Sequence, residues 1–231
     1  KIQGAGETIT LDKNYTYTSN DSIVSSGISI NKDITIDGDG HAIDGDNLAS
    51  IFQITDNANV VLKNIVFCNA RGNNGSAISL SSSENVEIIN SQFINNSALN
   101  GGAIYFANGG EIIKCDFTDN IATKNGGAVY FSNGSSIVEN CNFNNNTAEM
   151  GNAIYTNSNH CTVSECDFTN NPITEGAIHS VTGDITLSDN IFNADDVIQG
   201  RNFTEIQKLI DTANDGDEIT IDGLYAGFGI P

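Results

Sequence analysis

A short motif, Gly-Gly-Ala-Ile/Val-Tyr-Phe, returns at a nearly constant interval through the middle of the chain. Its clearest copies begin at Gly101 and Gly126, and weaker copies lie on both sides. A fixed period of this length is the signature of a tandem structural repeat, in which each unit packs on the next. The alanines of the five copies follow one another at steps of 26, 25, 25 and 24 residues: Ala77, Ala103, Ala128, Ala153 and Ala177.

A second marker, phenylalanine, keeps the same interval, with steps of 26, 24, 26, 25 and 24 residues. Two independent markers in step predict that residues about 25 positions apart lie directly over one another, so that each column of the sequence becomes a ladder of stacked side chains. The phenylalanine column is Phe67, Phe93, Phe117, Phe143, Phe168 and Phe192.

The spacing of apolar residues decides which repeat fold is expected. Each unit of about 25 residues holds three short apolar stretches separated by turn residues. A unit of this length is too short for a four-stranded propeller blade. Leucine is too scarce for a leucine-rich repeat. We therefore predict an all-β fold, a right-handed parallel β-helix (a solenoid) with three strands per coil, about 25 residues per coil and coils ~4.8 Å apart.

The predicted β-helix occupies residues 1–200. Beyond Gly200 the apolar period becomes helical, which predicts a C-terminal amphipathic helix. The segment Glu218–Gly223 then repeats the Ile-Thr-Ile-Asp-Gly sequence found near the start of the chain. Residues 201–231 are thus expected to form a helix plus a strand, either as an end cap or as the start of a second β-helix module.

Strand alternation assigns the columns to faces. The phenylalanines point inward, as do the small residues two positions earlier, Ser91, Cys115, Cys141 and Cys166. The chain has five cysteines, so they cannot all be paired, and we expect buried free thiols. Asparagines at the bends suit backbone in the left-handed region.

In the strand of the repeated motif, Ile and Phe are expected to point inward. Alternation then predicts that Ala and Tyr face outward. The outward column holds Tyr105, Tyr130, Tyr155 and His179, and we call it the tyrosine strip. An aromatic strip is a candidate for binding a sugar or a protein partner. Stacked rings on a sheet surface can equally serve only to stabilise the sheet. Both interpretations stay open at this point.

Net charge is −20, from 29 acidic and 9 basic residues. Such an excess argues against nucleic acid and against an anionic membrane surface as partners. No apolar run reaches the ~18–20 residues of a membrane span, so membrane insertion within this segment is not expected.

Four carboxylates gather in ten residues at Asp37, Asp39, Asp44 and Asp46. Loops rich in Asp and Gly can bind calcium, but this spacing is not that of an EF-hand. Turn formation is the favoured interpretation and calcium the weaker one. No other cofactor is predicted.

For catalysis, the carboxylate pair Asp116 and Asp167 lies two coils apart, about 9–10 Å, at the upper edge of the ~6.5–9.5 Å of an inverting glycosidase. Exposed carboxylates on a ladder have no evident means of raising a pKa, as a general acid requires. The chain is therefore not expected to be an enzyme.

The motif residues carry a family resemblance. Gly-Gly-Ala-Ile/Val at 101–104 and 126–129, alternating with Phe-x-x-Asn, resembles the repeats of polymorphic outer-membrane-type adhesins. The segments Ile34–Gly45 and Val61–Phe67 are more similar still to adhesin-like surface proteins of methanogenic archaea. This resemblance implies a secreted, extended binding protein held at the cell surface, and it carries over no catalytic residues.

The leading functional expectation is therefore a cell-surface adhesin that binds a cell-surface glycan or a protein of another cell. A carbohydrate-active enzyme, a polysaccharide lyase or glycosidase, is the alternative. A third hypothesis is an inert spacer that projects another domain.

Overall fold

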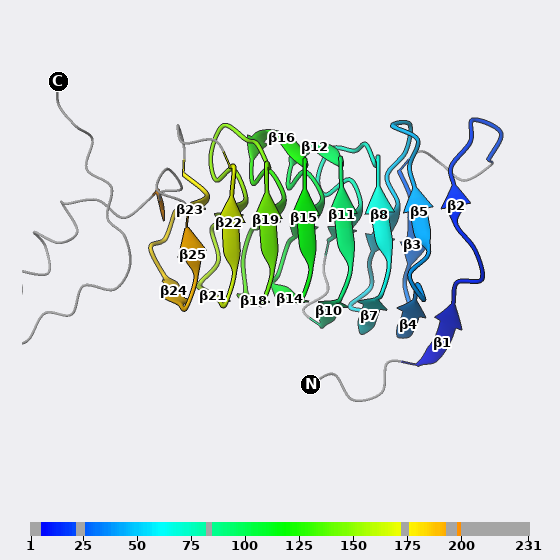
Figure 1. The fold of residues 1–231 in the computed structure, drawn as a ribbon. Helices are drawn as coiled ribbons and strands as arrows, with labels where there is room; N and C mark the ends of the chain where they lie inside the picture. The colour runs from blue at the N-terminus through cyan, green and yellow to red at the C-terminus, as the bar shows by residue number, and fades with distance from the viewer. Residues whose placement is uncertain (1–5, 22–25, 82–84, 172–175, 193–197, 200–231) are drawn as a thin grey trace, which may run out of the picture.

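The computed structural model describes residues 6–21, 26–81, 85–171, 176–192 and 198–199, and the described chain winds as a parallel β-helix (Figure 1). Three long sheets run its length, each with eight strands in the described part. Each coil contributes one strand to every sheet, which confirms the predicted architecture. The predicted C-terminal helix lies outside the described residues. The described residues contain no helix long and apolar enough to cross a membrane.

We name the sheets A, B and C in chain order. Sheet A contains β1 (Glu7–Thr10), β4 (Ile34–Asp37), β7 (Val60–Lys63), β10 (Val86–Ile89), β14 (Gly110–Ile113), β18 (Ser135–Glu139), β21 (His160–Ser164) and β24 (Ile185–Ser188). Sheet B contains β2 (Tyr15–Thr16), β5 (Ala42–Asp44), β8 (Val66–Cys68), β11 (Gln92–Ile94), β15 (Asp116–Thr118), β19 (Asn142–Asn144), β22 (Asp167–Thr169) and β25 (Ile191–Phe192). Sheet C contains β3 (Ile28–Ile30), β6 (Phe52–Ile54), β9 (Ile78–Leu80), β13 (Ile104–Phe106), β17 (Val129–Phe131), β20 (Ile154–Thr156), β23 (Ile178–Ser180) and β26 (Ile198–Gln199). Two further strands, β12 (Ser97–Asn100) and β16 (Ile121–Asn125), pair with each other between sheets B and C.

The register follows the sequence period. Phe93 pairs with Phe67 on one side and with Phe117 on the other, all strands running parallel. Adjacent rings of the phenylalanine column lie 4.8–5.0 Å apart between centroids and within 12° of parallel. The predicted column is therefore a physical stack along the solenoid axis.

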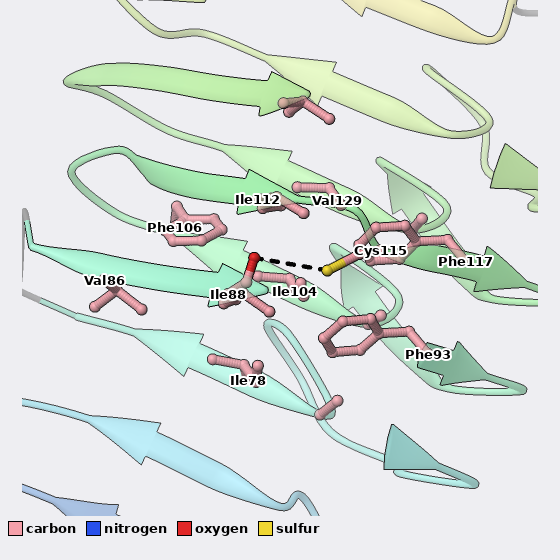
Figure 2. Close-up of a cluster of buried hydrophobic side chains, with 14 of the residues drawn as sticks. Ile78, Val86, Ile88, Phe93, Ile104, Phe106, Ile112, Cys115, Phe117 and Val129 are labelled. Atoms are coloured by element: carbon pink, nitrogen blue, oxygen red, sulfur yellow. Dashed lines mark hydrogen bonds between the residues drawn. The ribbon is translucent and has the colours of Figure 1, made fainter. Parts of the chain in front are cut away.

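The core fills the space between the three sheets, as Figure 2 shows for Ile88, Phe93, Ile104 and Cys115. The cysteine column points inward as predicted, and the Cys115 thiol donates to the carbonyl oxygen of Ile88 at 3.6 Å. All five cysteines are free. Burial raises the pKa of Cys161 to about 12, so this thiol stays protonated and unreactive near neutral pH.

The predicted orientation of the alanine column is wrong. The alanine column was expected to face solvent beside the tyrosines, yet Ala103 and its four counterparts are fully buried. The strand begins only at Ile104, so Ala103 belongs to the corner before it. Alternation of faces applies within a strand and does not extend backward through a bend.

Asparagines at the corner between sheets A and B take up the left-handed backbone that the bend requires. Asn64, Asn90 and Asn140 have φ of 56°, 46° and 55°. Lys114 and Glu165 occupy the same corner with φ of 55° and 53°. Left-handed backbone costs roughly 1–2 kcal/mol for residues other than Gly, Asn or Asp. Lysine and glutamate are therefore locally unfavourable at these two positions.

A second corner, after sheet B, holds a fully internal amide ladder made of Asn96, Asn120, Asn146 and Asn171. Asn120 donates from Nδ2 to the carbonyl oxygen of Phe93 at 2.9 Å. Its Oδ1 accepts from the backbone N–H of Asn96 at 3.1 Å and from the Asn96 Nδ2 at 3.0 Å. The ladder therefore satisfies backbone groups that the turn would otherwise leave unpaired.

We predict that Asn120→Ala lowers the free energy of unfolding by about 2–4 kcal/mol, because it leaves buried donors and acceptors in two neighbouring coils unpaired. Urea denaturation followed by circular dichroism measures the change. The control is Asn133→Ala, an exposed asparagine, which we expect to change stability by less than about 0.5 kcal/mol. Equal losses in the two variants would contradict the structural role of the ladder.

Candidate functional site

The tyrosine strip exists as a column on the outer face of sheet C. Tyr105 pairs with Tyr130, Tyr130 with Tyr155, and Tyr155 with His179. Ring centroids are 5.0, 4.8 and 5.1 Å apart in that order, with interplanar angles of 14°, 12° and 6°. All four side chains are half-buried.

The stack limits what the strip can bind. Rings that lie parallel at van der Waals distance cover one another's faces, so a sugar cannot lie flat on an inner ring. The strip instead presents ring edges and tyrosine hydroxyl groups. Phenols are protonated at neutral pH and can donate hydrogen bonds, and burial raises the pKa of Tyr130 and of Tyr155 above the ordinary value.

The two end rings of the strip are exceptions. Tyr105 pairs with Ser79 on the preceding coil, and His179 pairs with Gln199 on the following one, so strand pairing gives neither of them a second ring neighbour. The face of Tyr105 toward Ser79 is thus one place along the strip where an apolar sugar face could stack.

Glycine is required at the corner that precedes the strip. Gly101 has φ of 58°, and a Cβ there would clash first with the backbone carbonyl group of Ile104 and would lie 3.2 Å from the Cβ of Tyr130 on the next coil. A side chain would therefore be strained by the backbone and, to a lesser degree, crowded by the tyrosine. The glycine of the repeated motif thus sets the tight corner from which the strand of the strip begins.

A polar groove at the corner between sheets A and B was not anticipated from the sequence. It is a hollow of about 580 Å³, and its lining includes Asp39, Asn64, Asn90, Gln92, Lys114 and Asp116. The sequence did carry one signal: Lys114 stands in a column otherwise occupied by asparagine in neighbouring coils.

The walls of this groove come from local departures from the repeat. Between β4 and β5 the corner spans residues 38–41, whereas later coils turn with two residues, such as Asn64 and Ile65. The longer corner places Asp39 and Gly40 beside the groove. Lys114, exposed on its own coil, lies at the same groove two coils beyond Asn64.

Two of the four carboxylates near the start of the chain, those of Asp37 and Asp44, serve as turn acceptors. Asp37 Oδ1 accepts from the backbone N–H of Asp39 at 3.1 Å and from Asn64 Nδ2 at 2.9 Å. The hydrogen bond from Asn64, helped by Lys63, holds the pKa of Asp37 below its usual value. Asp44 likewise accepts from the N–H of Asp46 at 2.8 Å. Nowhere in the described ranges do three His, Cys, Asp or Glu side chains gather as a metal site would require, and calcium binding stays a prediction.

The carboxylates Asp116 and Asp167 lie two coils apart, with Asn142 between them in register. Asn142 donates from Nδ2 to Asp116 Oδ1 at 2.7 Å. An amide therefore fills the gap in which a glycosidase would hold its substrate and water. Asp116 also lines the polar groove, whereas Asp167 does not.

These features define a β-solenoid with two outward-facing polar surfaces, the tyrosine strip and the groove. The sequence matches the family described as the right handed beta helix region over residues 26–193. The chain belongs to this family, whose fold is shared by adhesins and by polysaccharide-active enzymes. No curated protein and no solved structure matches the chain.

If ring stacking holds sheet C, Tyr130→Phe should leave the free energy of unfolding within about 0.5 kcal/mol of wild type, because the stack is kept. Tyr130→Ala should lower it by about 2–4 kcal/mol, since two stacked contacts and a half-buried ring are lost. Thermal and urea unfolding of the two variants checks this. Similar losses of unfolding free energy in both variants would show that the hydroxyl group, rather than ring stacking, stabilises sheet C.

Proposed function

We propose that this chain is a binding module of a secreted, cell-surface adhesin that attaches to a glycan or a protein on another cell. The observation that carries the proposal is the outward ladder of Tyr105, Tyr130 and Tyr155, held in register by strand pairing. Its hydroxyl groups repeat every coil, about 4.8 Å apart, on a sheet that need not reorganise on binding. A preformed row of donors suits an extended, repetitive partner.

The charge of the chain favours partners that are not polyanions. A net charge of −20 repels acidic polysaccharides and nucleic acids. The similarity of the repeats to those of archaeal adhesin-like proteins and polymorphic outer-membrane-type adhesins supports the same proposal. An exposed location is consistent with the turn-rich, acidic composition, which keeps an extended solenoid soluble.

The alternative is a polysaccharide lyase or glycosidase, and one observation favours it: the groove brings Lys114 and Asp116 to one hollow. A lysine and a carboxylate can share proton transfer and charge stabilisation. Release of reducing or unsaturated ends from polysaccharides, abolished by Asp116→Asn, would establish this activity. The adhesin proposal is preferred because Asn142 lies between Asp116 and Asp167, the two carboxylates that a glycosidase would use as a pair.

The attachment test uses beads coated with the chain and a panel of microbial and host cells. We expect wild-type beads to adhere, and the triple variant Tyr105→Phe, Tyr130→Phe, Tyr155→Phe to adhere at least tenfold more weakly. Three hydroxyl groups are lost while the ring stack remains, and each hydrogen bond is worth about 0.5–1.5 kcal/mol.

The matched control is Thr186→Val, which removes an exposed hydroxyl group from sheet A. It should adhere like wild type. Adherence no greater than that of uncoated beads would identify the module as a spacer. Full adherence of the triple variant would place the attachment site away from the strip.

A further inference from the structure

The asparagine corner between sheets A and B is built as a chain of amide hydrogen bonds. Asn90 donates from Nδ2 to Asn64 Oδ1 at 2.7 Å, and Asn64 donates to Asp37 Oδ1 at 2.9 Å. The next coil should continue this ladder with a third amide, but it has Lys114. The lysine adopts the same left-handed backbone, with φ of 55°, without the side chain that favours it.

This substitution breaks a local rule at the edge of a cavity. Unfavourable backbone of this kind clusters at functional sites, and at Lys114 it coincides with the lining of a polar hollow. Lys114 is exposed and makes no ion pair with any residue in the described ranges. Its ammonium group is thus available to a ligand in the groove.

The shape of the groove fits a short linear molecule. Asp39 and Gly40 lie at one end, Lys114 and Asp116 at the other, and the amides of Asn64, Asn90 and Gln92 lie between. The corners from Asp39 to Lys114 span three coil steps, about 14 Å. The volume of about 580 Å³ is in the range of ordinary ligand pockets, ~300–1,000 Å³.

The chemistry of the lining selects the ligand class. Amides both donate and accept, carboxylates accept, and the ammonium donates, which together match the hydroxyl groups of a sugar. Asp39 and Asp116 disfavour an acidic ligand, and the overall charge of −20 adds to that repulsion. The lining residues therefore favour an uncharged ligand rich in hydroxyl groups.

We propose that the groove over Asn64, Asn90 and Lys114 binds an uncharged oligosaccharide, lying along the solenoid axis, with Lys114 as a principal hydrogen-bond donor. This inference rests on the proposed attachment function, and it places the glycan at a corner distinct from the tyrosine strip on sheet C. Gln92, exposed on β11, contributes a further amide contact to the ligand.

The experiment separates binding from folding because the key variant is expected to be more stable than wild type. Lys114→Asn restores the ladder amide and a residue that tolerates left-handed backbone, so its unfolding temperature should rise. The same change removes the ammonium group, so binding should weaken tenfold or more. The probe is the tightest-binding trisaccharide from an array of uncharged hexose and N-acetylhexosamine oligosaccharides, titrated by calorimetry.

The matched control is Glu165→Asn, which likewise places a residue that tolerates left-handed backbone at the same corner, outside the groove, and keeps a side-chain oxygen that can accept from Asn140 as Glu165 does. We expect it to unfold at a higher temperature and to bind the trisaccharide within twofold of wild type. Gln92→Ala should weaken binding severalfold and serves as the deciding variant if Lys114→Asn proves unstable.

Three results would overturn the inference. Wild-type affinity in both Lys114→Asn and Gln92→Ala would place the ligand elsewhere. Equal loss of affinity in Glu165→Asn would indicate a general structural effect. Absence of binding to every array oligosaccharide would exclude an uncharged glycan. Attachment of beads to cells is measured separately, so the proposed function survives or fails independently of these outcomes.

Discussion

Strand pairing between successive coils is the interaction on which the rest of the structure depends. Every strand of a coil pairs in parallel with the equivalent strand of the next, so residues one period apart are direct neighbours. Similar side chains then meet along the axis, as aromatic stacks, amide ladders and thiols, and also as a carboxylate pair, Glu87 beside Glu111 in sheet A. In the outer column of sheet B, Asp116 lies beside Gln92 and Asn142 rather than beside another carboxylate. Amide neighbours avoid the repulsion that stacked carboxylates would suffer.

The two candidate surfaces show opposite uses of this constraint. The tyrosine strip obeys the repeat, and its stacked rings contribute stability together with a regular row of hydroxyl groups. The groove departs from the repeat, through the longer corner at 38–41 and through Lys114 in an asparagine column. A regular ladder suits a repetitive partner bound over a long contact. A departure from the ladder creates a local hollow with its own arrangement of donors and acceptors, which suits a smaller ligand.

Much of the fold could be predicted because the period alone fixes which residues are neighbours. The stacked Phe93 and Phe117, the inward Cys115 and the bends at Asn90 all follow from it. The facing of Ala103 could not be predicted by alternation, since the exact residue at which a strand begins is set by corner geometry. The column of Tyr130 was predictable, but the covering of its ring faces depends on side-chain orientation. The groove was not predicted because it arises from different corner lengths on neighbouring coils, which only the folded backbone brings together.

Register, rather than any individual contact, specifies this structure, and deletion of one whole coil is the sharpest test of that dependence. Removing residues 117–142 joins Asp116 to Phe143, so that Phe143 takes the place of Phe117 and every column is kept. We expect a folded, shorter solenoid with a β-sheet circular dichroism spectrum and a cooperative urea transition. Removing only residues 117–129, half a coil, should abolish that transition. Cooperative folding of the half-coil deletion, or failure of the whole-coil deletion to fold, would contradict the account.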